Sequence, residues 1–124
     1  VEAIWGIGVQ KIQYTDWLTE RSDADIWQYR FSSFSSSCTE EIVNCAKAQL
    51  DKPYGFFNLN LNDSKSFYCS KLIWYSVFNT LGLAVDNNPN PERFIWYSPR
   101  QLMGSQYLEP IYSPGPYGVS SANV

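Results

Sequence analysis

The first third of the chain is rich in β-branched and aromatic residues, which in places alternate with polar ones as is typical of short strands. Three segments are predicted strands: residues 1–5, 9–13 and 26–31. Gly6 and Gly8 separate the first two, and glycine permits the backbone angles that a bend requires. In the third segment the aromatic side chains share one face, and Gln28 and Arg30 lie on the other. We therefore expect a strand pair at the start of the chain and a half-buried strand near residue 30.

Apolar residues at helical spacing predict a first long helix over residues 38–50. Ser37 and Glu40 have the spacing of a capping box, in which each side chain bonds to a free backbone N–H of the first turn, so they are predicted to open it. We expect the helix to end near Lys52 and Pro53, because proline cannot continue a helix.

A second long helix is predicted from Cys69 to Leu81, where the chain is apolar on nearly every side. Gly82 is placed to close this helix as a left-handed cap. A helix with so little polar surface must be buried on most sides. It is therefore predicted to form the centre of the domain.

Shorter elements are expected on either side of these helices. Residues 15–18 offer capping chemistry for one helical turn, and residues 98–103 combine an N-cap Ser, a first-position Pro and a Gln at capping-box spacing. Residues 107–112 can form a last strand. Residues 113–124 have the Pro, Gly and Ser content of a tail.

Composition supports one domain and excludes several classes of partner. The chain has 124 residues, of which 44% are hydrophobic and 17% charged, as expected for a single globular core. Nine basic and twelve acidic residues give a net charge of -3, which argues against a groove that binds nucleic acid. No apolar run approaches the roughly 20 residues of a membrane-spanning helix, so no transmembrane segment is expected.

Two residue counts restrict the chemistry. Aromatic residues make up 17% of the chain, and histidine, the commonest general base and metal ligand, is absent. The three cysteines, Cys38, Cys45 and Cys69, leave at least one thiol unpaired. In a helix Cys38 and Cys45 would be separated by about 10 Å along the axis, too far for a disulfide. No metal-ligand spacing is present, so neither a metal site nor a cofactor is expected.

Cys69 is the candidate for chemistry because it begins the most apolar helix. A thiolate at that position faces unpaired backbone N–H groups and the positive end of the helix dipole, both of which favour the nucleophilic form. A lone cysteine near a helix start is, however, more often a small core residue than a nucleophile. Position alone therefore favours a packing role.

The segment around Cys69 resembles that of a known enzyme family, and this resemblance favours a catalytic role over a packing role. Residues 67–74, Phe-Tyr-Cys-Ser-Lys-Leu-Ile-Trp, resemble the nucleophile segment of the circularly permuted, NlpC-like branch of papain-fold cysteine hydrolases. These are the YiiX-like bacterial proteins, which are distantly similar to lecithin retinol acyltransferase. Shorter matches occur at residues 1–3, 52–56 and 96–103, in the same order as in the family. The family usually has an acidic residue where Gly55 stands and often Glu where Lys71 stands, and these departures are expected to bear on local structure and on the charge of the cleft more than on the reaction.

The resemblance implies an α+β, permuted papain-like fold, in which a small antiparallel sheet packs against the central buried helix. It implies a single such domain over residues 1–112, with a strand expected upstream of Val1, followed by the tail over residues 113–124. The chain begins with Val rather than Met, which is compatible with a processed upstream portion. Its location is left open between the cell envelope and secretion after processing.

The resemblance also implies a mechanism. Cys69 would be the nucleophile, Glu2 would orient the catalytic imidazole, and the Cys69 backbone N–H would stabilise the oxyanion. Tyr54 and Tyr68 are candidate substrate-binding residues. The substrate would be a peptide, a cell-wall peptide or a lipid ester, hydrolysed through a thioester.

The family's general-base histidine has no counterpart in this chain, and its expected position lies upstream of Val1. The helix dipole contributes only about 0.3–1 kcal/mol and cannot protonate a leaving group, so it is a poor substitute. Either an upstream segment or a partner chain supplies the histidine, or the chain is a catalytically inactive binding module.

A third reading is a secreted, aromatic-rich protein that binds carbohydrate or assembles with its neighbours. Under this reading Trp5, Trp17 and Trp96 would form a contiguous exposed row.

Overall fold

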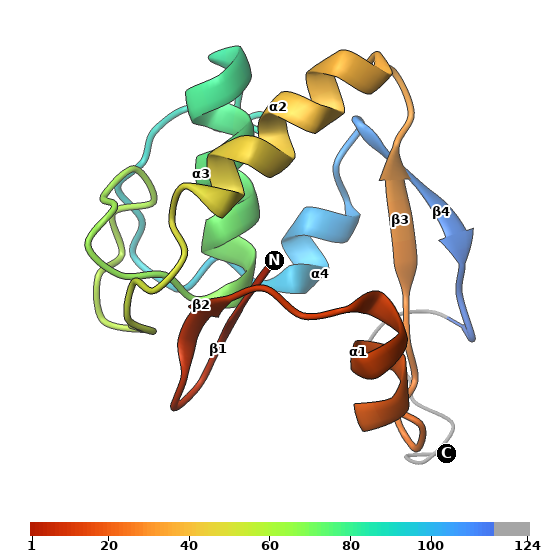
Figure 1. Cartoon of the computed structure of the whole chain (residues 1–124). Coiled ribbons are helices and arrows are strands. Elements are labelled where there is room, and N and C mark those ends of the chain that lie inside the picture. Colours follow the sequence, from red (N-terminus) through yellow and green to blue (C-terminus); the bar gives the residue numbers. More distant parts are fainter. Residues whose placement is uncertain (116–124) are drawn as a thin grey trace.

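In the part of the chain that the structure describes, one helix lies at the centre, with two antiparallel strand pairs and three further helices around it (Figure 1). A computed structural model describes residues 1–115. The elements in chain order are β1 (Glu2–Ile4), β2 (Gly8–Gln10), α1 (Tyr14–Glu20), β3 (Gln28–Phe31), α2 (Ser36–Lys47), α3 (Cys69–Leu81), α4 (Pro99–Met103) and β4 (Leu108–Tyr112). Of the predicted tail, residues 116–124 lie outside the described part of the chain.

The strands form two separate antiparallel pairs within residues 1–115, where the sequence predicted one small sheet. β1 pairs with β2, so that Ala3 lies opposite Val9. β3 pairs with β4, which lies about 80 residues later in the sequence. Gly8 is required in β2 because its φ is +103° and a Cβ there would collide with the Lys52 carbonyl. This close approach lets the Val9 N–H donate to the same carbonyl, which fastens the first hairpin to the segment after α2.

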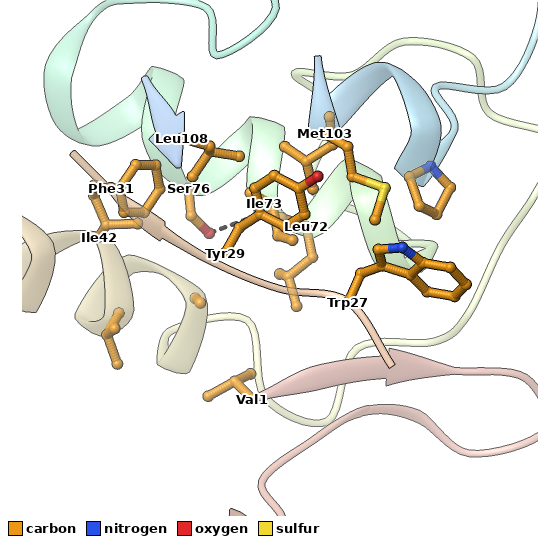
Figure 2. A pocket seen from close by; sticks show the side chains of 14 residues that line it. Val1, Trp27, Tyr29, Phe31, Ile42, Leu72, Ile73, Ser76, Met103 and Leu108 are labelled. Atoms are coloured by element: carbon orange, nitrogen blue, oxygen red, sulfur yellow. Dashed lines mark hydrogen bonds between the residues drawn. The ribbon is translucent and has the colours of Figure 1, made fainter. Parts of the chain in front are cut away.

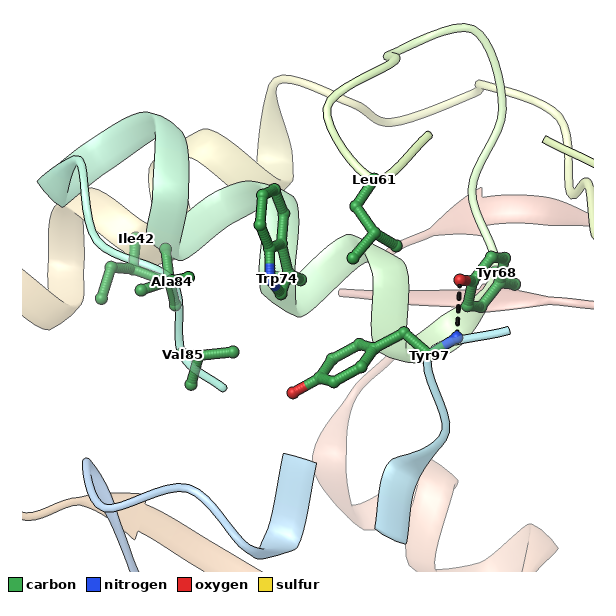
Figure 3. Packing of buried hydrophobic residues seen from close by; sticks show 8 residues of the cluster. Ile42, Leu61, Tyr68, Trp74, Ala84, Val85 and Tyr97 are labelled. Atoms are coloured by element: carbon green, nitrogen blue, oxygen red, sulfur yellow. Dashed lines mark hydrogen bonds between the residues drawn. The ribbon is translucent and has the colours of Figure 1, made fainter. Parts of the chain in front are cut away.

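α3 is the buried centre that the sequence predicted. Trp74 and Val77 are fully buried, and Gly82 closes the helix with a left-handed φ of 70°. One side of α3 packs into the main core, which is drawn in Figure 3. Another side packs on the first hairpin, where Leu72 and Phe67 contact Ala3 and Val9.

The helix ends show how far local capping rules hold. At α4 the predicted capping box between Ser98 and Gln101 is present. At α2 the predicted cap was wrong, because Ser35 rather than Ser37 accepts the hydrogen bond from the Cys38 N–H. Ser35 has extended backbone angles and can therefore serve as the cap, whereas Ser37 already lies inside the helix. α2 also ends at Lys47, earlier than predicted, and turns follow it. α1 runs for two turns rather than one.

Asp86 fastens the loop after α3 back onto that helix. Its carboxylate accepts hydrogen bonds from the Trp74 indole N–H at 3.0 Å and from Arg93 at 2.7 Å. The side chains of the Asp86–Arg93 ion pair are each only 11% exposed. Burial alone would raise the pKa of Asp86, but the hydrogen bonds from Arg93, Trp74 and the Asn88 N–H outweigh it and lower that pKa below its ordinary value.

We predict that Asp86→Asn destabilises the fold by on the order of 3 kcal/mol, because it leaves the Arg93 guanidinium largely buried without a counter-charge. The lowered folded pKa means that the carboxylate stabilises the native state above about pH 4 and that this stabilisation is lost as the pH falls through the folded value. Urea unfolding at several pH values measures both effects, with Glu40→Gln on the exposed face of α2 as a control. Equal stability of the two variants at neutral pH would contradict the role given to Asp86.

Candidate active site

Cys69 is the first residue of α3, and its side chain is exposed although both of its neighbours are buried. Both neighbours, Tyr68 and Ser70, are hydrogen-bonded to the backbone of Tyr97, just before α4. The Tyr97 N–H donates to the Tyr68 hydroxyl at 3.0 Å, and the Ser70 hydroxyl donates to the Tyr97 carbonyl. Because the residues on each side of Cys69 are turned into the core, the thiol between them faces outward.

The thiol opens into a cleft of about 720 Å³ between α3 and the first elements of the chain. Residues from β1, the segment after β2, α1, the loop before α3 and α3 itself line the cleft: Val1, Glu2, Ala3, Ile4, Trp5, Ile12, Tyr14, Trp17, Arg21, Tyr54, Cys69, Leu72 and Ile73. The walls are predominantly apolar and aromatic, with Glu2 and Arg21 as the charged side chains. Such a cleft has the composition of a small-molecule or peptide site.

Glu2, the second candidate catalytic residue, lines the same cleft as Cys69. Its carboxylate accepts a hydrogen bond from the Gln10 amide at 2.7 Å and another from Arg21 at 3.4 Å. Arg21 in turn stacks over the Trp17 ring at 4.4 Å, which holds the guanidinium beside β1. The carboxylate is thus anchored in position rather than free in solvent.

Of the two candidate substrate-binding tyrosines, Tyr54 lines the cleft and Tyr68 does not. Tyr54 lines the cleft, where its backbone forms a β-bridge with Phe67. Burial, then the adjacent Cys69 and Tyr68, raise the pKa of Tyr54, so its hydroxyl stays protonated and can donate a hydrogen bond. Tyr68 is buried and stacks on Phe56, and it is absent from the cleft lining.

A second cavity, of about 410 Å³, continues along α3 from the cleft (Figure 2). The two spaces share three lining residues: Val1, Leu72 and Ile73. Side chains of α2, β3, β4 and α4 form the rest of the second cavity, which is almost wholly apolar. Ile73, one turn after Cys69, is 38% exposed there. The sequence missed this opening, because an apolar helix gives no signal for the side on which its covering is incomplete.

The family departures at Gly55 and Lys71 fit the local packing. A Cβ at Gly55 would collide with the Ser66 side chain. Lys71 is fully buried, donates to the Ser66 carbonyl at 2.8 Å and lies 5.2 Å from the Phe67 ring centre. Burial lowers the pKa of Lys71. Both residues serve the loop under α3, and neither lines the cleft.

The other two cysteines and the possible metal ligands within residues 1–115 do not form a second candidate site. All three cysteines are free thiols, and Cys38 and Cys45 are partly buried on α2, outside the cleft lining. Within residues 1–115, no cluster of His, Cys, Asp and Glu side chains could hold a metal ion. The same part of the chain contains no helix that is long and apolar enough to cross a membrane.

Comparison with solved structures gives a match to metalloprotein yiiX from Escherichia coli O157:H7. The TM-score is 0.71 and the identity 19%, over 93% of this chain and 75% of that one. This likeness confirms the fold. No curated protein matches the chain.

Comparison with protein families gives a match over residues 1–120 to the permuted papain-like amidases of the YaeF/YiiX type. The predicted α+β, permuted papain-like fold and the predicted cysteine hydrolase class are thereby confirmed. The chain belongs to the C92 family of permuted papain-like amidase enzymes.

Proposed function

We propose that this protein hydrolyses an amide or ester bond through a thioester on Cys69. The observation that carries the proposal is the exposed thiol at the first position of α3, facing a cleft that also holds the anchored carboxylate of Glu2. A substrate carbonyl in this cleft would meet the sulfur and the free N–H groups of the first helical turn together.

The reaction proceeds in two balanced steps. In the first, the Cys69 thiolate attacks the carbonyl carbon, and the tetrahedral oxyanion is held by the backbone N–H groups at the start of α3. The amine or alcohol then leaves with the proton that the base took from the thiol. In the second step a water molecule, deprotonated by the same base, cleaves the thioester and regenerates the thiol.

The base is an imidazole from outside these 124 residues, since the chain contains no histidine. An upstream segment or a partner chain would supply it. The open surface of α3 supports this proposal, because Leu72 and the exposed Ile73, close to Cys69 on the helix, line both the cleft and the second cavity. Glu2 would be a positioning residue that orients the imidazole. Tyr54 would bind substrate, and Tyr68 is left out of the binding set because it lies in the core.

The family description favours an amide substrate over an ester. A peptide, a cell-wall peptide and a lipid ester remain the substrate classes of the proposal. The competing proposal is an inactive binding module that keeps the cleft. It differs from the enzyme in two measurable properties, the selective reactivity of Cys69 and Cys69-dependent hydrolysis in the presence of an added base.

We predict that iodoacetamide near neutral pH alkylates Cys69 at least about tenfold faster than Cys38 or Cys45, because the Cys69 side chain is exposed in the cleft whereas the other two are partly buried on α2. Peptide mapping of the native protein by mass spectrometry measures the three rates in one sample. Matched single-thiol variants, C38S/C45S and C38S/C69S, provide the control. Equal, slow labelling of all three thiols would favour the binding module.

We also predict that added imidazole raises Cys69-dependent hydrolysis of p-nitrophenyl acetate by about tenfold, since it replaces the missing general base. The rate is the difference between the native protein and Cys69→Ala at each imidazole concentration. Glu2→Gln should abolish most of this increase while leaving alkylation of Cys69 without imidazole unchanged. Glu109→Gln, which removes an exposed carboxylate of β4, serves as the matched control. The positioning role of Glu2 is refuted if both variants respond to imidazole equally.

A further inference from the structure

Three loops carry a group of large apolar side chains, most of them exposed. We call this set the aromatic rim: Trp5 and Ile7 in the β1–β2 turn, Phe56 and Phe57 in the loop after α2, and Phe94, Ile95 and Trp96 before α4. Phe94 is 100% exposed and Phe57 92%, while Trp5 and Trp96 are 71% and 50% exposed. Single exposed apolar residues are ordinary on a protein surface, but a group of this size requires an explanation.

Ring contacts join the three loops into one surface. The Phe56 ring lies 5.9 Å from the Trp5 ring and 4.6 Å from the Trp96 ring, measured between centres. The Trp96 indole N–H also donates to the Phe56 carbonyl, which locks two of the loops together. The first hairpin and the loop after α2 lie on the same side of the molecule (Figure 1).

The aromatic rim borders the cleft. Trp5 belongs to both, and its ring lies 5.7 Å from that of Tyr54, another cleft residue. Trp17, in contrast, is partly buried and stacks on Tyr14, so it stands apart from this surface. The predicted exposed row therefore contains Trp5 and Trp96 but not Trp17.

The segments that form the aromatic rim contain no charged residue. Residues 3–10, 53–62 and 94–99 have no Asp, Glu, Lys or Arg, although 17% of the whole chain is charged. The net charge is -3, which opposes docking on an anionic surface. The charge pattern thus matches a surface that is itself electrically neutral.

We propose that the aromatic rim docks this protein on a zwitterionic lipid surface and thereby places the mouth of the cleft at the lipid–water interface. Trp side chains are preferred at that interface, and Phe and Ile tips insert into its apolar layer. Phe57 and Phe94 are the most exposed members of the aromatic rim, so they are the side chains that would enter the apolar layer. The proposal concerns binding and does not depend on the chemistry of Cys69.

Vesicles of phosphatidylcholine test the proposal. The native protein should float with the vesicles, and its tryptophan emission should shift to shorter wavelength, with little dependence on salt because few charges take part. The double variant F57S/F94S should lower the partition coefficient by at least about tenfold, because it removes two inserted apolar groups. Cys69→Ala should bind as the native protein does, which separates this proposal from the proposed reaction.

The matched control is I111S/Y112S, which removes two exposed apolar side chains from β4, away from the aromatic rim. This variant should keep its partition coefficient within about twofold. The proposal would be overturned if the protein failed to bind neutral vesicles, or bound only anionic ones. Equal losses of binding in the two double variants would also overturn it. So would binding to an insoluble polysaccharide, or self-association, without binding to vesicles.

Discussion

Two hydrogen bonds to the backbone of Tyr97 determine what Cys69 can do. One holds Tyr68 and the other holds Ser70, so the helix start is fixed on both sides of the cysteine and only the thiol is left outside the core. Apart from the side at Ile73, α3 packs into two apolar clusters rich in aromatic residues, which stabilise the helix. The Asp86–Arg93 pair adds to this, because Arg93 lies over the rings of both Trp74 and Tyr97.

The carboxylate opposite the thiol depends on a different set of contacts. Glu2 is positioned by Gln10 on the neighbouring strand and by Arg21 at the end of α1. The first hairpin is in turn placed by the Gly8 contact with Lys52, so a glycine that takes no part in the chemistry determines where the carboxylate lies. The site is therefore assembled from two independently anchored parts, the start of α3 and the β1–β2 hairpin.

Features that arise from neighbours in sequence were predictable, and features that arise from distant contacts were not. The span of α3, its Gly82 cap and the capping box of α4 follow from periodicity and from hydrogen bonds within one turn. The predicted cap at Ser37 was wrong because the helix begins at Ser36, so that Ser35, which lacks the capping-box spacing, is the residue with extended backbone angles that accepts the Cys38 N–H. Cys69 and Glu2 became candidates through resemblance, since neither spacing nor composition indicates that residues so far apart in sequence line one cleft.

The opposite positions of Tyr54 and Tyr68 show the same limit. Both tyrosines stand near Cys69 in the sequence motifs, but the β-bridge to Phe67 turns Tyr54 toward the cleft, while the bond from Tyr97 turns Tyr68 inward. The second cavity, at Ile73, was likewise not predictable from the sequence, because it depends on which elements pack against α3 rather than on the residues of α3 itself.

The most direct test of this account is to locate the acyl group after the protein reacts with an activated ester in the presence of imidazole. Acid quenching followed by peptide mapping would identify the modified residue. The account predicts a hydroxylamine-sensitive acyl group on Cys69 in preference to Cys38 and Cys45, and its loss in Cys69→Ala. Acylation spread evenly over the three thiols, or its absence from Cys69, would contradict the account.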